Sequence, residues 1–322
     1  MHPLEEDQVA AFLKEVQGSP HEYLYKIALF TGLREGEILG LGWEHIDLEN
    51  GILTVKRQLR KEQKSELANI IYDTMFANQD AALRRNVPSC QDTGVIQYFI
   101  QCGSKFPLLG DIPQCLPEAA KRATKKAPLR HNAVQIFDEK NTGNNTGVRI
   151  PYTDWEIIPD SDECTIYCYL AGGGCSLPGT AKVFMPVEGY EGVVKFIFDL
   201  ICERGINACP PLLVGIGIAG SAEVAAVLSK KALMRPVGSH NSNTRGAEFE
   251  QIIAEGLDKL NIGPNGLGGT KTVMGVNVEQ AARHPSCLAA AVNVGCWAHR
   301  RAGIRFKADL SYEVFTHKGV TL

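Results

Sequence analysis

The chain has 322 residues, of which 44% are hydrophobic and 21% charged, and its formal net charge is -3. That charge disfavours a general nucleic-acid binder, which usually carries a basic excess. The sequence contains no apolar run of about 18 residues or more, so no membrane span is predicted. Residues 1–7 are acidic and lack the apolar region of a secretory signal. We therefore expect a cytoplasmic protein, in which ten cysteines indicate metal binding or catalysis more often than disulfides.

Residues 1–62 predict a small helical appendage that ends in a short strand. Apolar residues recur there at helical spacing, and helices are expected over 4–17, 20–32 and 34–43. A strand is predicted at 51–55. The charged stretch 60–66 is typical of a solvated join, so the domain boundary is placed between residues 62 and 63.

The remaining chain, 63–322, mixes helical and strand patterns without a clean βαβ repeat. Helices are predicted at 67–83, 117–126, 190–206, 221–234 and 245–260. The second of these is expected to open at Pro117. Strands are predicted at 95–100, 164–170, 212–218, 272–279, 287–294 and 303–310. This order predicts an α/β fold with mixed sheets flanked by helices.

Three cysteines stand in marked surroundings. Cys90 opens a Cys-Gln-Asp-Thr-Gly turn, Cys209 precedes two prolines, and Cys296 begins a Cys-Trp-Ala-His-Arg-Arg stretch. Proline biases the residue before it to extended geometry, so Cys209 is expected in a loop rather than in a helix. No CxxC pair indicates a zinc ribbon or a ferredoxin-type motif. The other cysteines are interpreted as buried small hydrophobes: Cys102, Cys115, Cys164, Cys168, Cys175, Cys202 and Cys287.

Two glycine-rich runs allow more than one interpretation. Residues 215–220 match G-x-G-x-x-G, but a dinucleotide site needs an acidic residue about twenty positions on. Residues 235–245 contain no carboxylate, so tight packing of a strand on a helix is favoured over a nicotinamide cofactor. Residues 172–174 are three glycines, whose backbone N–H groups can bind a carboxylate. A turn that binds nothing is the alternative.

Two further polar residues are candidates for a site. Arg130 carries a planar fork that matches a carboxylate with two parallel hydrogen bonds. Taken alone, it is equally typical of a solvated surface charge. His284 lies twelve residues before Cys296 in the sequence, and a lone histidine is more often structural than catalytic.

The first segment carries a resemblance of its own. Residues 31–39 (Thr-Gly-Leu-Arg-Glu-Gly-Glu-Ile-Leu) and 43–48 (Trp-Glu-His-Ile-Asp-Leu) resemble the start of the catalytic domain of phage-type tyrosine recombinases. In that family the arginine matching Arg34 contacts the scissile phosphate. A His-x-x-Arg box and a nucleophilic tyrosine do not follow, so we expect an inactive appendage, and a DNA-binding recombinase fragment remains an alternative function.

From about residue 66 to residue 322 a second resemblance holds. Besides the three cysteine contexts, it rests on the segments 127–134, 141–147, 171–179 and 188–196. Together these resemble the α subunit of the two-subunit iron–sulfur hydro-lyases, the class I fumarase and L(+)-tartrate dehydratase family. The stretch 295–301 is more similar to the tartrate branch, so the resemblance implies conversion of L-tartrate to oxaloacetate. Interconversion of fumarate and malate is the alternative.

The resemblance also implies a cofactor, a ligand set and a partner. A 4Fe–4S cluster would be held by Cys90, Cys209 and Cys296, which leaves one iron open to a 2-hydroxy dicarboxylate substrate. A β subunit, in an α2β2 assembly, would supply the base that removes the carbon-bound proton. The α chain alone is therefore expected to carry a cluster and to be inactive.

Further residues take their roles from the same resemblance. Gln91, Arg130 and the backbone of Gly173 would hold the substrate carboxylates. Asp92 would give a proton to the leaving hydroxide, assisted by His284.

Overall fold

The computed structural model describes Lys14, residues 46–47 and 52–53, and residues 56–316. The helices predicted at 4–17, 20–32 and 34–43 lie outside the described residues. Two short strands, β1 (Ile46–Asp47) and β2 (Ile52–Leu53), pair antiparallel, and α4 (Lys56–Lys61) follows them. The chain divides into two compact units, 1–62 and 63–322. The second unit contains all the site residues predicted above.

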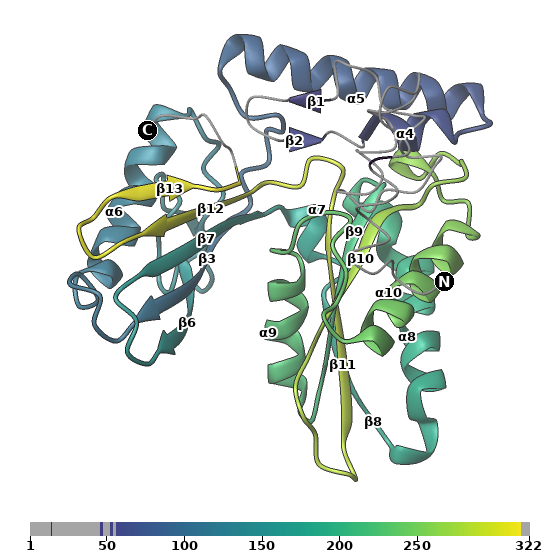
Figure 1. Ribbon diagram of the computed structural model, residues 1–322. Helices are drawn as coiled ribbons and strands as arrows, with labels where there is room; N and C mark the ends of the chain where they lie inside the picture. The colour runs from purple at the N-terminus through teal and green to yellow at the C-terminus, as the bar shows by residue number, and fades with distance from the viewer. Residues whose placement is uncertain (1–13, 15–45, 48–51, 54–55, 317–322) are drawn as a thin grey trace. The chain divides into compact units, whose positions relative to one another are not determined.

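The second unit opens with a long helix and a five-stranded sheet (Figure 1). The helix α5 (Glu66–Arg85) begins at Ser65, whose hydroxyl accepts from the Ala68 N–H, and ends at the left-handed Asn86. The sheet has the strand order β13-β12-β7-β3-β6. Its strands are β3 (Val95–Gly103), β6 (Tyr152–Ile158), β7 (Cys164–Ala171), β12 (Arg301–Phe306) and β13 (Tyr312–Val314).

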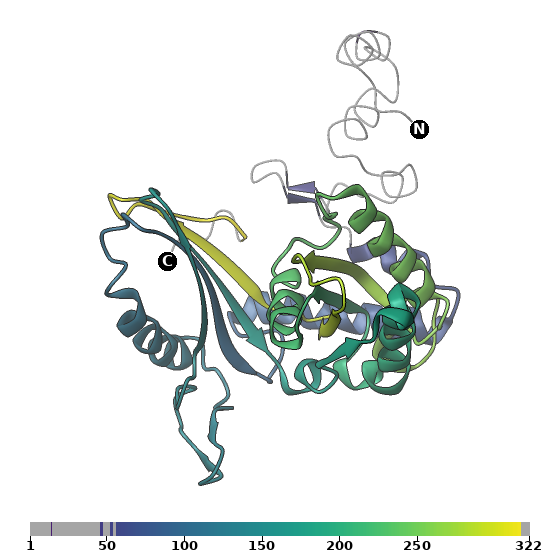
Figure 2. The same ribbon diagram turned by 90° about the horizontal axis from the view of Figure 1, so that it is seen from below.

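One helix, α6 (Ile112–Lys126), covers a face of this sheet, as Figure 2 shows. Its Leu116 and Ala120 pack against Ile96 and Ile100 of β3. The helix was predicted to open at Pro117, which is wrong, because it begins at Ile112 with Pro113 in its first turn and keeps Pro117 inside. A proline in the first turn lacks only an N–H that has no helical partner there, so it marks the start.

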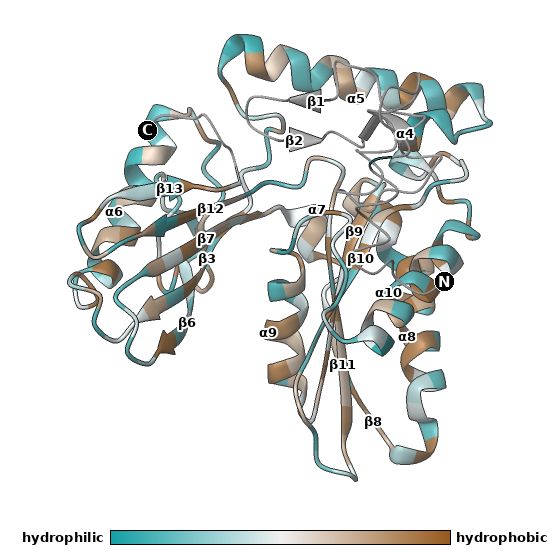
Figure 3. Cartoon of the chain, viewed as in Figure 1, coloured by the Kyte–Doolittle hydropathy of each residue, from teal (hydrophilic) through white to brown (hydrophobic). Residues whose placement is uncertain are grey.

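A four-stranded sheet with the order β10-β9-β11-β8 forms the rest of the unit. Its strands are β8 (Thr180–Phe184), β9 (Leu212–Ala219), β10 (Val273–Gln280) and β11 (Leu288–Gly295). The strands β9 and β10 run parallel and are joined through α9 (Ala222–Ala232) and α10 (Thr244–Asp258). The strand β11 pairs antiparallel with β9, and every residue of β11 is buried. Figure 3 shows hydrophobic residues along β9.

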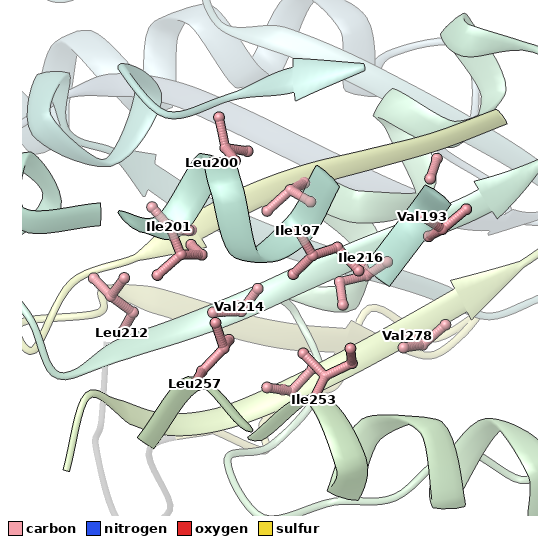
Figure 4. Packing of buried hydrophobic residues seen from close by; sticks show 14 of the residues in the cluster. Val193, Ile197, Leu200, Ile201, Leu212, Val214, Ile216, Ile253, Leu257 and Val278 are labelled. Atoms are coloured by element: carbon pink, nitrogen blue, oxygen red, sulfur yellow. The ribbon is translucent and has the colours of Figure 1, made fainter. Parts of the chain in front are cut away.

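The main core lies between this sheet and two helices, α8 (Gly189–Arg204) and α10. Ile197 and Ile201 of α8 and Ile253 of α10 are fully buried against Val214 and Ile216 of β9, and Figure 4 shows them interleaved. Burial of such side chains contributes roughly 1.5–3 kcal/mol each, so β9 is held firmly in the core.

The other face of the sheet carries α9, and it explains the glycine-rich run in β9. A Cβ built at Gly217 would lie 2.0 Å from the Ala225 carbonyl oxygen of α9, and one at Gly215 would lie 2.3 Å from the Ser229 oxygen. The predicted tight packing of strand on helix is therefore what these glycines provide.

Edge strands account for the main differences from prediction. The strand expected at 303–310 is β12, which ends at Phe306 before a turn into β13. The strands β6 and β8 were not predicted, because nearly all of their residues are partly buried or exposed and no apolar alternation marks them. The other predicted helices and strands of the second unit are confirmed, with their ends moved by a few residues.

Candidate active site

Two of the three singled-out cysteines lie at one end of the four-stranded sheet. Cys209 stands three residues before β9, and Cys296 directly follows β11. These strands are antiparallel with Leu213 opposite Gly295, so the start of one lies beside the end of the other. The Trp297 N–H donates a hydrogen bond to the Cys209 carbonyl oxygen at 3.1 Å, which joins the two loops.

Cys209 lies in a loop, as predicted, but it is not extended. It ends the short 3-10 helix η3 (Gly205–Ala208) with φ 52° and ψ 74°, a left-handed conformation. Its N–H bonds to the Ile206 carbonyl at 3.3 Å and closes the last helical turn. The extended geometry expected from Pro210 is therefore wrong, because the helix end demands a chain reversal at this residue.

The loop that carries Cys90 approaches from the other sheet and is centred on Asp92. One carboxylate oxygen of Asp92 accepts the Gly173 N–H at 2.7 Å, and the other accepts the Gly94 N–H at 2.9 Å and the Asn132 amide at 2.6 Å. At Gly94, where φ is 72°, a Cβ would lie 2.2 Å from the Ala171 carbonyl oxygen, so only glycine fits there.

Asn132 is itself held by a buried side chain. The Asn145 side-chain oxygen accepts the Asn132 N–H at 2.7 Å, and its amide donates to the Arg130 carbonyl and to the Thr124 hydroxyl, each at 3.1 Å. Asn145 is 1% exposed and has φ 59°. The Asn-rich loop around residue 145 thus positions the segment that reaches Asp92, a role that sequence reasoning did not assign to either asparagine.

The three-glycine run contacts both the loop that carries Cys90 and the loop that carries Cys209. It starts the short helix α7 (Gly173–Ser176), and a Cβ at Gly174 would lie 2.6 Å from the Asn207 carbonyl oxygen in the Cys209 loop. The run was expected to bind a carboxylate through its backbone N–H groups. In this structure the Gly173 N–H donates to the carboxylate of Asp92, a residue of the same chain. Cys175, which was placed among the buried small hydrophobes, is buried within this turn.

The thiol pKa values indicate that these cysteines share one electrostatic environment. Burial raises the pKa of the Cys209 thiol. The negative charges of Cys296, Cys90 and Asp92 raise the pKa of this thiol further. A hydrogen bond from the Cys296 thiol lowers the pKa of Cys175 against the opposing effect of burial, and the same bond raises the pKa of Cys296.

The donor set suits an iron–sulfur cluster better than a single ion. Among the described residues, no three His, Cys, Asp or Glu side chains lie close enough together to hold one metal ion. A four-iron cluster binds each thiolate through a different iron, so its ligands stand farther apart than those of one ion. Cys90 and Cys296 are half-buried and Cys209 is exposed, on three loops that meet around Asp92. These residues fit a cluster.

The remaining predicted residues lie in two different places. Gln91 and Arg130 are exposed, and each is within two residues of a group in the Asp92 network. His284 is exposed and lies at the opposite end of the sheet. A Cβ at Gly220, which follows β9, would lie 3.5 Å from the backbone nitrogen of His284. Eight residues of β9 separate that end from Cys209, about 25 Å. Within one chain the structure does not bring His284 to Asp92.

The other cysteines follow the sequence interpretation only in part. Cys102 and Cys164 are buried, and Cys168 and Cys287 are partly buried. Burial raises the pKa of the Cys164 thiol to about 12. Cys115 on α6 and Cys202 on α8 are exposed, so the prediction that they are buried is wrong. Both lie on the outer faces of amphipathic helices.

Comparisons with known proteins find a matching family and several relatives. A family model described as Fumerase, fumarate hydratase, matches residues 45–305. The L(+)-tartrate dehydratase subunit alpha of Escherichia coli strain K12 is 56% identical over 261 residues, which cover 81% of this chain and 86% of that protein. The same holds for the namesake protein of strain UTI89. A putative L(+)-tartrate dehydratase subunit alpha of Methanocaldococcus jannaschii is 35% identical over 79% of this chain and 92% of its own length.

Among the helices of the described residues, none has the length and apolar character that a membrane span requires.

The family match begins at residue 45, inside the first compact unit and ahead of the boundary at 62. The match covers most of the chain, including all three cysteine loops and the Asp92 network. The chain therefore belongs to the Fumerase, or fumarate hydratase, family.

Proposed function

We propose that the chain is the α subunit of an iron–sulfur hydro-lyase that removes water from a 2-hydroxy dicarboxylate, with L-tartrate as substrate and oxaloacetate as product. The observation that carries this proposal is the meeting of three cysteine loops around the Asp92 carboxylate. The bacterial and archaeal relatives named as tartrate dehydratase subunits support the choice of substrate. The family description favours fumarate and malate as the alternative.

Cys90, Cys209 and Cys296 would hold the 4Fe–4S cluster. When bound, it supplies one iron without a protein ligand, which can act as a Lewis acid toward the substrate hydroxyl and carboxylate. The chain's own part is to place these cysteines on loops that are anchored in different ways. The Cys209 and Cys296 loops are anchored in the sheet core, and the Cys90 loop is anchored through Asp92.

The substrate carboxylates would be bound by Gln91, Arg130 and Gly173. The exposed guanidinium of Arg130 is free to form a bidentate pair with a carboxylate. The Gly173 N–H donates to Asp92 in this structure, so a substrate carboxylate that takes this donor displaces the Asp92 oxygen. Binding of substrate would thereby release that oxygen of Asp92 for proton transfer.

Asp92, protonated from solvent on the oxygen that the substrate frees, would deliver that proton to the departing hydroxide and return to its carboxylate form. Its second oxygen remains held by Asn132 and the Gly94 N–H, which keeps the side chain oriented while the first oxygen acts. His284 can assist only from another copy of the chain, since within its own chain it lies at the far end of β9, about 25 Å from Cys209. This placement supports an assembly with two α chains, to which a β subunit adds the base.

A turnover assay tests the proposed function. The chain is loaded with iron and sulfide without oxygen, combined with the β subunit of a related dehydratase, and supplied with L-tartrate, malate or fumarate. We expect oxaloacetate from L-tartrate only when both subunits are present, and loss of that activity in Asp92→Asn. Turnover of malate and fumarate in preference to tartrate would support the alternative, and no turnover of any of them by a loaded complex would refute the proposal.

Mixing two inactive variants tests the contribution of a second copy. In a two-fold assembly, a chain with Asp92→Asn beside one with His284→Ala leaves one site with both residues intact. Random mixing should restore about a quarter of the activity of the unmodified complex. Lack of any recovery, in mixtures shown to exchange chains, would place both residues in one chain's site. Full activity of His284→Ala by itself would remove His284 from the reaction.

A further inference from the structure

Two buried side-chain nitrogen atoms of Arg300 lack a hydrogen-bond partner among the described residues. It lies between Cys296 and β12, and its carbonyl oxygen accepts the Leu170 N–H of β7 at 3.1 Å, so its backbone is fixed. Its Nε and Nη1 atoms are buried and have no hydrogen-bond acceptor in the described part of the chain. An arginine does not lose its proton in proteins, and a buried charge without partners is strongly unfavourable. The fold therefore keeps a costly group in place.

The surroundings of Arg300 are the cysteine loops. A Cβ at Gly172 would lie 3.8 Å from its Nη2 atom and 2.9 Å from the Asp92 carboxylate, so the two side chains flank the three-glycine run. Its positive charge also acts on the Cys175 and Cys296 thiols, although their mutual hydrogen bond has the larger effect on both pKa values. The guanidinium thus faces the place where the cluster would bind.

Acidic side chains do not explain this arginine. Among the described residues it forms no ion pair within 4.0 Å, whereas Arg235 pairs with the buried Glu250 at 2.8 Å. The nearby carboxylate of Asp92 already accepts three N–H donors. The Nε and Nη1 atoms thus lack an acceptor among the residues that the structure describes.

We propose that Arg300 is a positioning residue for the iron–sulfur cluster, and that its Nε–H and Nη1–H groups donate hydrogen bonds to sulfur atoms of the bound cluster and of its ligand Cys296. This inference rests on the proposed function. Cluster sulfides and thiolates are electron-rich acceptors, and hydrogen bonds to them raise the reduction potential of such clusters. Partners of this kind beyond the metal ligands also hold a metal group in place.

The inference predicts that Arg300→Met has opposite effects in the chain without cluster and in the chain with cluster. Without cluster, two nitrogens of the partly buried Arg300 lack an acceptor among the described residues, so Arg300→Met should leave the thermal unfolding midpoint unchanged or raise it. With cluster, the same substitution removes the hydrogen bonds. It should speed the loss of iron to a chelator about tenfold and shift the reduction potential of the cluster to a more negative value.

The test uses the full chain, purified without oxygen and measured with its cluster and after its removal. Arg300→Lys keeps the charge but loses the fork, so an intermediate effect on potential and iron loss is expected. Arg305→Gln, which replaces an exposed arginine on β12, the strand that follows Arg300, is the matched control and should change neither the reduction potential nor the rate of iron loss. If Arg300→Met fails to fold, Arg300→Lys carries the measurement.

Three results would overturn the inference. An unchanged reduction potential and an unchanged rate of iron loss in a loaded Arg300 variant would refute it while leaving the proposed function intact. Absence of iron in the unmodified chain would refute both together. A higher KM for L-tartrate in the complex, with unchanged potential and iron loss, would make Arg300 a substrate-binding residue instead.

Discussion

The candidate site is assembled from two regions that are positioned by different forces. Cys209 and Cys296 stand at the ends of β9 and β11, whose residues are almost wholly buried in an apolar core. Cys90 and Asp92 lie on a loop that is held by hydrogen bonds between polar side chains. The comparison indicates that the sheet fixes two of the proposed ligands through packing, while the third proposed ligand and the proposed proton donor depend on a few polar contacts.

Loss of one strand-end ligand should have the largest effect. Cys209→Ala removes one of three thiolates, and we expect the iron content of the anaerobically purified chain to fall from about four per chain to almost none. Cys202→Ala is the matched control, because Cys202 is also an exposed cysteine but lies on the outer face of α8. Equal iron in both variants would exclude Cys209 as a ligand.

Crowding the strand tests the packed region itself. A methyl group at Gly217 would meet the Ala225 carbonyl oxygen at 2.0 Å, so Gly217→Ala should lower the free energy of unfolding by about 3 kcal/mol. Gly110→Ala serves as the control, since nothing lies within 4 Å of a Cβ there. Denaturant unfolding of the two variants gives the comparison, and similar midpoints would contradict the tight packing of α9 on β9.

Breaking the polar region should leave the sheet intact. Asn145→Ala removes the partners of the Thr124 hydroxyl, the Arg130 carbonyl and the Asn132 N–H, which should cost about 2 kcal/mol. Because Asn132 then loses its hold on Asp92, turnover in the complex should fall further than this loss of stability explains. The exposed Gln251→Ala is the control. Full turnover in Asn145→Ala would show that Asp92 is oriented without this network.

A smaller effect concerns Lys230, next to Cys175. Burial lowers the pKa of this lysine from the usual 10.5 to about 8, against the nearby Cys175 charge that raises it. The unfolded chain therefore binds more protons between these values, and the lysine's contribution to stability should increase as the pH rises from about 8 to 10.5. The full shift is worth about 3 kcal/mol, and partial exposure reduces it to about 1 kcal/mol.

The difference in unfolding free energy between the unmodified chain and Lys230→Met measures this effect. The variant should be relatively more stable at pH 7 than at pH 10. Lys195→Met, which removes a lysine side chain that is 75% exposed on α8, is the control for the loss of a surface charge. A pH-independent difference for Lys230→Met would mean that its ammonium is well solvated.

The packed region was the more predictable of the two. Apolar runs in β9 and β11 and helical spacing in α8 and α10 identify these elements, because burial leaves a local pattern in the sequence. The edge strand β8 and the first turn of α6 leave a weaker pattern, and both were missed. The contexts of Cys90, Cys209 and Cys296 pointed to a shared site through their resemblance to a family rather than through their spacing.

The polar region could not be derived from the sequence. Asp92 meets Asn132 across 40 residues and Gly173 across 81, and such pairs leave no periodic pattern. The unpartnered nitrogens of Arg300 become visible only when the fold has buried them. Likewise, a separation of only twelve positions between His284 and Cys296 suggests proximity, whereas the extended strand β11 places them at opposite ends of the sheet.

The most direct test of the account is the iron and acid-labile sulfide content of the full chain purified without oxygen, together with its absorption spectrum. The account predicts about four irons and four sulfides per chain, with a charge-transfer band that disappears on oxidation in air. No iron, under conditions in which a known cluster protein keeps its own, would contradict it and leave the three cysteines as ordinary thiols around Asp92.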